Sequence, residues 1–127
     1  MKKKENLKYI ASFNCQGLVT SPVKLTQLAD DFESNKIDIL AVQETHIQGL
    51  SVIDITSNNN NTYKLYNCGN DKKSIYGIGI VVHPSRTVEF DPIRERICRI
   101  STAINNGQKL NVLRVYAPTL EVSEANP

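Results

Sequence analysis

The chain has 127 residues, of which 40% are hydrophobic and 22% are charged, and its formal net charge is +2 at pH 7. A chain of this length forms one domain or part of one, and its composition is ordinary for a soluble globular protein. This charge neither implies nor excludes nucleic acid as a partner. No segment reaches the about 18 consecutive apolar residues of a membrane span, and no apolar segment typical of a secretory signal follows the lysines at positions 2–4. An intracellular protein, nuclear or cytoplasmic and without a membrane partner, is therefore expected.

Three cysteines, Cys15, Cys68 and Cys98, are spread along the chain without a CxxC pair. Their odd number and wide spacing predict neither a disulfide framework nor a zinc site. A reducing compartment is the matching expectation.

The first predicted element is a strand in the segment YIASFN, residues 9–14, which is rich in aromatic and β-branched residues and ends before Gly17. Ser21 and Pro22 are typical of a helix start. The apolar residues of this helix recur at the spacing i, i+3, i+4 and i+7, namely Leu25, Leu28, Ala29 and Phe32. An amphipathic helix of about four turns is therefore predicted, ending near Asn35.

A second strand is predicted at residues 39–42, where the apolar run ILAV leads directly into Gln43 and Glu44. A continuous apolar run of this kind indicates a strand that is covered on both faces. Strand, helix and strand together predict a βαβ unit with a right-handed crossover and parallel strands. Asn14 and Glu44 then lie at the same edge of the sheet, at the carboxyl ends of the strands, where ligands bind in open sheets with helical crossovers.

After this unit the sequence predicts strands only. Polarity rises beyond Gln48, and the asparagine run at 58–61 is interpreted as a loop. Strands are predicted in five further segments, residues 62–67, 76–83, 87–90, 97–104 and 110–117. The last two flank Asn105, Asn106 and Gly107, a strong hairpin signal. No repeat and no second domain boundary is predicted.

Glu44 most needs a chemical explanation, because a charge that leaves a buried strand must reach solvent, a partner or a metal ion. Asn14 at the same edge carries both a donor and an acceptor on its amide. From the residues alone, other interpretations stay open. Glu44 is compatible with a solvated strand end, Asn14 with a turn before Gly17, and Tyr116 with a core aromatic residue.

Four segments, in order, resemble the endonuclease/exonuclease/phosphatase superfamily. SFNCQGL, residues 12–18, resembles the opening strand with its metal-site Asn, and DILAVQETHI, residues 38–47, resembles the segment that carries the metal-binding Glu. YGIGIVVHP, residues 76–84, resembles the glycine-rich strand, and RICRISTAINNGQKLNVLRVYAPT, residues 96–119, resembles the hairpin that ends at an active-site Tyr-Ala-Pro. The QETH and VYAPT forms are most similar to LINE-type retrotransposon endonucleases and the cellular genes derived from them.

The resemblance implies an α/β (α+β) fold, the N-terminal half of a four-layer αββα sandwich. This partial domain would span residues 8–119, between a basic tail at 1–7 and a second tail at 120–127. The implied function is a Mg²⁺-dependent endonuclease that hydrolyses DNA phosphodiester bonds, with Mn²⁺ as an alternative ion and no small-molecule cofactor. DNA is the implied partner of the complete domain.

The same resemblance implies roles for individual residues. The expected set is Asn14, Glu44 and Tyr116 as catalytic residues, Glu44 and Asn14 as metal-site residues, and Gln43, Arg96 and Arg99 as substrate-binding residues. One Glu is a sufficient protein ligand for Mg²⁺, because this ion keeps most of its waters and takes phosphate oxygens. His46 does not match the catalytic His of the family and is interpreted as a loop residue.

Complete members of the superfamily continue with segments that supply further catalytic residues, including a terminal Asp-His pair, whereas residues 119–127 contain no Asp and no His. Because a general acid or base typically contributes about 10²- to 10⁴-fold in rate, the chain alone is expected to be inactive. Bare sheet faces and strand edges would also make it poorly stable. Two other functions stay open: a member that acts on lipid or inositol phosphates, and a non-catalytic remnant that binds a partner or nucleic acid.

Overall fold

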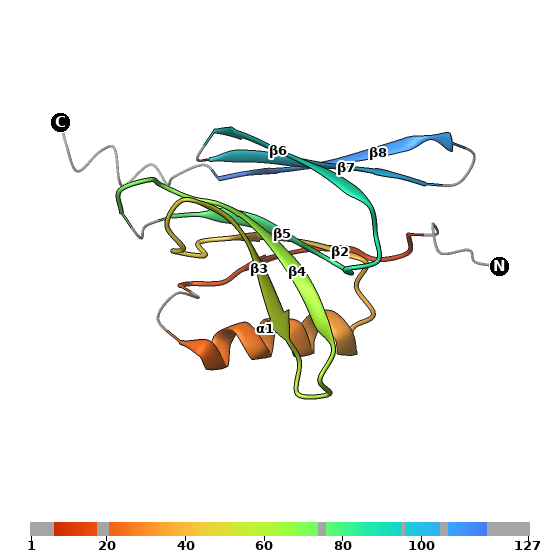
Figure 1. Ribbon diagram of the computed structural model, residues 1–127, viewed down its shortest axis with the longest axis horizontal. Helices are drawn as coiled ribbons and strands as arrows, with labels where there is room; N and C mark the ends of the chain where they lie inside the picture. Colours follow the sequence, from red (N-terminus) through yellow and green to blue (C-terminus); the bar gives the residue numbers. More distant parts are fainter. Residues whose placement is uncertain (1–6, 18–20, 74–75, 95, 105–106, 117–127) are drawn as a thin grey trace.

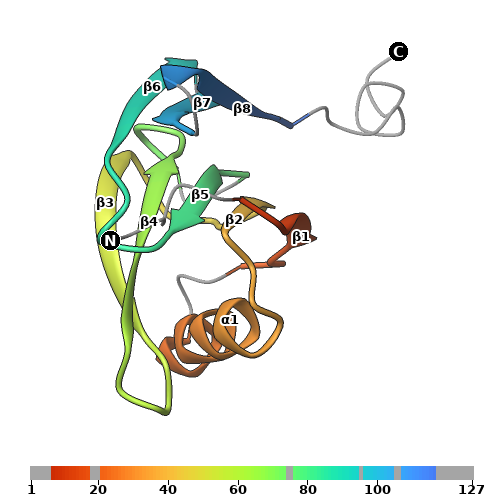
Figure 2. The ribbon, with the colours of Figure 1, turned by 90° about the vertical axis from the view of Figure 1, so that its right-hand side faces the viewer.

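The computed structural model describes residues 7–17, 21–73, 76–94, 96–104 and 107–116. Its elements, in chain order, are β1 (Ile10–Asn14), α1 (Pro22–Ser34), β2 (Ile39–Gln43), β3 (Leu50–Thr56), β4 (Thr62–Cys68), β5 (Ile78–Val82), β6 (Val88–Arg94), β7 (Ile97–Ala103) and β8 (Lys109–Val115). A large sheet has the strand order β1-β2-β5-β4-β3, and a small sheet has the order β6-β7-β8. Figure 1 shows α1 against one face of the large sheet and the small sheet over the other face. Figure 2 shows the same three layers from the side.

The predicted parallel βαβ unit is confirmed. Helix α1 connects β1 and β2, which pair in parallel with Asn14 opposite Gln43. Pro22 is the first residue of the helix, and Ser21 before it has an extended backbone with φ of −153°. The helix packs against the large sheet through three buried residues, Leu28, Ala29 and Phe32.

The asparagine run is a loop as predicted, but no element was predicted between Gln48 and this run, where residues 50–56 form strand β3 at the edge of the large sheet. Ile55 is buried and Ile53 packs against the core on the helix side, whereas Leu50 and Val52 are exposed. Apolar residues at odd and even positions obscure the period-2 alternation that indicates a strand. Pairing with β4 along its whole length then decides the conformation.

The asparagine run between β3 and β4 forms a hairpin turn that is held against α1. Asn58 donates hydrogen bonds from its backbone N–H and its Nδ2 to the carboxylate of Asp30, at 2.8 and 2.7 Å. Asn61 donates from its Nδ2 to the carboxylate of Glu33. Asn60 adopts the left-handed region with φ of 69°, which asparagine tolerates better than most residues. Side-chain amides therefore tie the end of this hairpin to the helix.

Strand β2 lies between two apolar cores, because successive side chains on a strand point to opposite faces. Leu40 and Val42 pack on the helix side of the large sheet, whereas Ile39 packs between the two sheets. Strand β5 follows the same pattern, with Val81 on the helix side and Ile80 between the sheets. The prediction of a strand covered on both faces is confirmed.

The fold class is α+β, and the arrangement is consistent with part of an αββα sandwich. The hairpin strands β7 and β8 are confirmed, although the predicted turn residues Asn105 and Asn106 lie outside the described residues. Of the predicted tails at 1–7 and 120–127, only Leu7 is described, and it packs against the core between the sheets. Within the described ranges, no helix is long and apolar enough to cross a membrane.

The buried thiols lead to a prediction about alkaline pH. Cys15, Cys68 and Cys98 are buried thiols that form no disulfide with one another, and burial raises the pKa of Cys15 and Cys98 to about 12. Because the folded-state pKa lies above the ordinary value of 9.0, both thiols contribute stability below about pH 9 that is lost as pH rises toward 12. The urea midpoint should therefore fall between about pH 8 and pH 10. A variant with Cys15→Ala and Cys98→Ala should show a smaller fall over the same interval.

Reactivity gives an independent check of the same burial. At about pH 8 the folded chain should react slowly with a thiol reagent, and all three thiols should react in urea. Rapid modification of Cys15 or Cys98 in the folded chain would contradict the packing described above.

Candidate functional site

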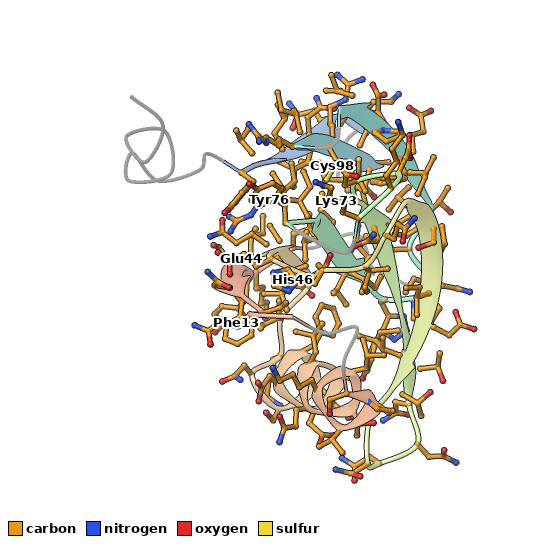
Figure 3. The ribbon with its side chains drawn as sticks, turned by 90° about the vertical axis from the view of Figure 1, so that its left-hand side faces the viewer. Phe13, Glu44, His46, Lys73, Tyr76 and Cys98 are labelled. Carbon is orange, nitrogen blue, oxygen red and sulfur yellow. The ribbon has the colours of Figure 1, made fainter. Side chains whose placement is uncertain are left out.

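Five strand ends meet at one edge of the two sheets. Strands β1, β2 and β8 end there, and β5 and β7 begin there, because β5 runs antiparallel to β2 and β7 runs antiparallel to β8. The residues at these ends are Asn14, Glu44, Tyr76, Arg96 and Tyr116. Hydrogen bonds link the ends, since the N–H of Tyr116 donates to the carbonyl of Arg96 at 2.9 Å and the N–H of His46 donates to the carbonyl of Tyr76 at 2.8 Å. Figure 3 shows Glu44 and Tyr76 on this side of the molecule.

The backbone at Glu44 is held in an uncommon conformation. Its φ is 58°, in the left-handed region that few residues other than glycine adopt. Its carbonyl accepts a hydrogen bond from the N–H of Gly17 at 2.7 Å, which joins the loops after β1 and β2. Strained conformations of this kind persist only where the surrounding structure enforces them, and they cluster at functional sites.

A buried polar network enforces the conformation of the loop that follows Glu44. Thr45 and Asn67 are both fully buried, and the Thr45 hydroxyl donates to Asn67 Oδ1 at 2.7 Å. Asn67 Nδ2 in turn donates to the carbonyls of Ile47 and Gly49, at 3.0 and 3.1 Å. Because every buried polar group in this network has a partner, the network fixes the loop rather than destabilising it.

The carboxylate of Glu44 accepts no hydrogen bond and forms no ion pair with any residue that the structure describes, and the residue is only partly buried. Its oxygens are the ligand type that a hard cation such as Mg²⁺ prefers. No group of three or more His, Cys, Asp or Glu side chains gathers anywhere in the described part of the chain. The donor set therefore fits an ion that takes one carboxylate from this chain and completes its shell with water or phosphate oxygens.

Asn14 and Gln43 lie side by side at the ends of β1 and β2. Asn14 Oδ1 accepts from the N–H of Gln16 at 3.0 Å, which is the turn interaction considered above, and no described residue accepts from its Nδ2. Gln43 Oε1 accepts from Arg114 Nη2 at 2.5 Å, and Arg114 Nη1 donates to Ser12 Oγ at 3.1 Å. Arg114 on β8 therefore connects the small sheet to both β1 and β2.

Tyr116, Tyr76 and Arg96 form a compact aromatic and cationic group. The two tyrosine rings lie 5.2 Å apart, and the Arg96 guanidinium lies 5.2 Å from the Tyr76 ring centroid. Burial raises the pKa of Tyr116, the charges of Glu44 and Tyr76 raise it further, and Arg96 opposes the rise. The Tyr116 hydroxyl is therefore protonated at neutral pH and available as a hydrogen-bond donor.

The structure brings Arg96 to this edge but places Arg99 elsewhere. Arg99 alternates with the buried Cys98 and Ile100 on β7, so it points away from the large sheet. Its Nη2 lies 2.7 Å from Asp91 Oδ2 on the neighbouring strand. The expected contact of Arg99 with substrate stays a prediction, and no observation at this edge supports it.

Sequence reasoning passed over two residues at this edge, Arg114 and Tyr76. The sequence held a signal for the position of Arg114, because alternation along β8 places Arg114 on the same face as Tyr116. Arg99 lies on the other face, since the hairpin register pairs it with Leu113. Tyr76 has no such signal. Its position depends on the left-handed backbone at Tyr76 and Gly77, with φ of 57° and 84°.

Comparison with known families agrees with the arrangement of the strand ends. The model of the Endonuclease/Exonuclease/phosphatase family matches residues 11–121, which is most of the chain and includes Asn14, Gln43, Glu44, Arg96 and Tyr116. The chain belongs to this family. The Endonuclease/Exonuclease/phosphatase family comprises nucleases and phosphatases, and its members generally use divalent metal ions. No curated protein matches the chain.

The loop after Glu44 provides a prediction about stability. A Cβ at Gly77 would lie 2.3 Å from Thr45 Oγ1, and the backbone there is left-handed, so Gly77→Ala must displace the buried hydroxyl. We expect a loss of about 2–4 kcal/mol in the free energy of unfolding, from backbone strain and the broken Thr45–Asn67 bond.

Gly49→Ala is the matched control for this substitution. Gly49 also has a positive φ, of 76°, but nothing lies within 4 Å of its added Cβ. Its cost should be limited to the about 1–2 kcal/mol of left-handed backbone strain. Equal losses for the two variants in urea unfolding would show that the Thr45 contact does not matter.

Proposed function

We propose that this chain carries the metal-binding and phosphate-binding part of a Mg²⁺-dependent endonuclease that nicks DNA by hydrolysing phosphodiester bonds. The observation that carries the proposal is the position of Glu44. Its carboxylate has no partner among the described residues, and it lies at a strand edge with the hydroxyl of Tyr116 and the guanidinium groups of Arg96 and Arg114. One available carboxylate beside several donors suits a cation that is shared with a phosphate group.

Each residue of the edge has a chemical role in this proposal. Glu44 would hold Mg²⁺, or Mn²⁺ in its place, with Asn14 beside it to orient the carboxylate or to donate from Nδ2 to a phosphate oxygen. An ion held there would offset the negative charge that builds up on the phosphate. Tyr116 donates its hydroxyl proton in a hydrogen bond to a phosphate oxygen, and Arg96 attracts the negative group through its charge.

Gln43 acts through Arg114 in this proposal. The bond between Gln43 Oε1 and Arg114 Nη2 fixes the guanidinium at the carboxyl ends of β1 and β2. Burial lowers the pKa of Arg114, but arginine stays charged at neutral pH. The Nε atoms of Arg96 and Arg114, like that of Arg99, are buried donors without an acceptor among the described residues.

No histidine among the described residues is placed as a general base at this edge. Of the two histidines in the sequence, His83 lies at the opposite end of β5, where its Nδ1 contacts the Ser85 hydroxyl at 2.8 Å. His46 packs its ring against Gly17, so that Nδ1 would lie 3.0 Å from a Cβ at that glycine. Without a base the rate is expected to fall by about 10²- to 10⁴-fold, so binding is the more sensitive readout.

Cation binding tests the role of Glu44 directly. Glu44→Gln keeps the size of the side chain and removes its charge, so the affinity for Mn²⁺, measured by calorimetry or electron paramagnetic resonance, should fall at least about tenfold. Glu89→Gln is the control, because Glu89 is exposed on β6 and faces Lys109 at 3.7 Å. The assignment of Glu44 fails if the two variants bind Mn²⁺ equally well.

Arg114 and Arg99, on adjacent strands of the small sheet, provide a second, independent test. Arg114→Lys cannot keep both bonds, to Gln43 and Ser12, and should weaken binding of an oligonucleotide in Mg²⁺ by about tenfold. Arg99→Lys is the control, because Arg99 pairs with Asp91 on the other face, and it should leave affinity unchanged. Similar losses in both variants would mean that the bound face is not the one at Glu44.

Substrate class is decided by comparing substrates under the same conditions. Nicking of supercoiled plasmid DNA with Mg²⁺ or Mn²⁺, lost in Glu44→Gln, is the expected result. Release of phosphate from an inositol or lipid phosphate, without nicking, would support the other branch of the family. Binding without any hydrolysis would support a non-catalytic role.

A further inference from the structure

A small cavity of about 170 Å³ lies beside the site, between the end of β1 and helix α1. Phe13 and Asn14 line it from the strand. The helix contributes Lys24, Gln27, Leu28 and Asp31, which share one face because they are spaced at i, i+3, i+4 and i+7. Asn14 therefore borders both this cavity and the edge that carries Glu44.

The wall of the cavity is partly aromatic. Phe13 is 47% exposed, although it is a large apolar side chain on a strand of the large sheet. Figure 3 shows Phe13 on the same side of the molecule as Glu44, with Tyr76 beyond Glu44. An exposed aromatic ring next to a phosphate-binding edge is a surface on which a planar group can stack.

The polar side chains that line the cavity use only part of their hydrogen-bonding capacity within the described part of the chain. No described residue donates a hydrogen bond to the carboxylate of Asp31 or bonds to the side-chain amide of Gln27. Lys24 Nζ donates to the carbonyls of Gln16 and Gly17, each at 3.2 Å, which leaves one of its three N–H groups. The cavity thus offers a carboxylate acceptor, an amide with both functions and one cationic donor.

These features determine which chemical groups the cavity can bind. The opposite charges of Asp31 and Lys24 leave the cavity without a net charge that would attract a phosphate group, and the carboxylate of Asp31 favours a ligand group that carries hydrogen-bond donors. The Phe13 ring favours a flat group, and Lys24 and Gln27 favour one that also carries acceptors. A nucleobase combines all three properties, because its edge presents donors and acceptors and its face stacks on aromatic side chains.

We propose that the cavity between β1 and α1 is a nucleobase subsite, which holds the base of a nucleotide next to the phosphate at Glu44. The base stacks on Phe13, donates to Asp31 and accepts from Lys24 or Gln27. Because a base reaches such a cavity only when it is unpaired, the substrate is single-stranded or locally opened nucleic acid. This inference rests on the proposed function, and it excludes an inositol or lipid phosphate as the occupant.

The test compares two single-stranded oligonucleotides that carry the same number of phosphates, one with bases and one with abasic sugars at its central positions. Fluorescence anisotropy in Mg²⁺ should show tighter binding of the oligonucleotide with bases. Phe13→Ala should weaken this binding by about tenfold and leave the abasic oligonucleotide unaffected, because stacking on one aromatic side chain is lost. Phe13→Tyr should restore the affinity, since it keeps a ring.

Tyr9→Ala is the matched control, because Tyr9 directly precedes β1, faces the same side as Phe13 and is 55% exposed, but does not line the cavity. It should change neither affinity. Equal binding of the two oligonucleotides by the unaltered chain would overturn the base subsite alone. If the chain binds neither oligonucleotide, the base subsite is also overturned. The proposed function is then overturned as well if Glu44→Gln binds Mn²⁺ as tightly as the unaltered chain.

Discussion

The hydrogen bond between Thr45 and Asn67 is the interaction on which the arrangement of the site depends. Both side chains are fully buried, and Asn67 uses its remaining donors on the two carbonyls of the same loop. This network holds the chain after β2 in place and thereby stabilises the left-handed conformation of Glu44. Gly77 completes the constraint, since only a residue without a Cβ leaves room for the Thr45 hydroxyl.

This constraint has an electrostatic consequence. A carboxylate that leaves a buried strand usually gains a cationic partner, yet the nearby Arg114 bonds to Gln43 and Ser12 and the Arg96 guanidinium lies over the Tyr76 ring. Glu44 is thereby held among donors, and none of the described residues forms an ion pair with it. An arrangement that leaves a negative charge and several donors unmatched is poor for stability but suitable for binding a cation together with an anion.

The position of the arginines shows how a strand pattern can mislead. Arg99 and Arg114 lie on adjacent strands of the same hairpin, and composition alone does not distinguish them. Alternation does, because Arg114 shares a face with Tyr116 and points into the molecule, whereas Arg99 points outward to Asp91. The turn signal in the sequence predicts the register of the hairpin. This register identifies Arg114 as the arginine at the site only when it is known which face of the hairpin packs against the large sheet.

Local patterns in the sequence determined the βαβ unit, the strand covered on both faces and the placement of Asn14 and Glu44 at the same edge of the sheet. Helix periodicity, a proline at the helix start and the length of an apolar run are properties of neighbouring residues, so they survive without tertiary information. Only the tertiary structure decided that residues 50–56 form a strand, that Tyr76 and Arg114 join the site, and that a cavity opens beside Asn14. The strand depends on its pairing with β4, the cavity on the packing of α1 beside the end of β1, and the positions of Tyr76 and Arg114 on contacts with distant segments. The pattern of neighbouring residues does not determine which segments pack together in this way.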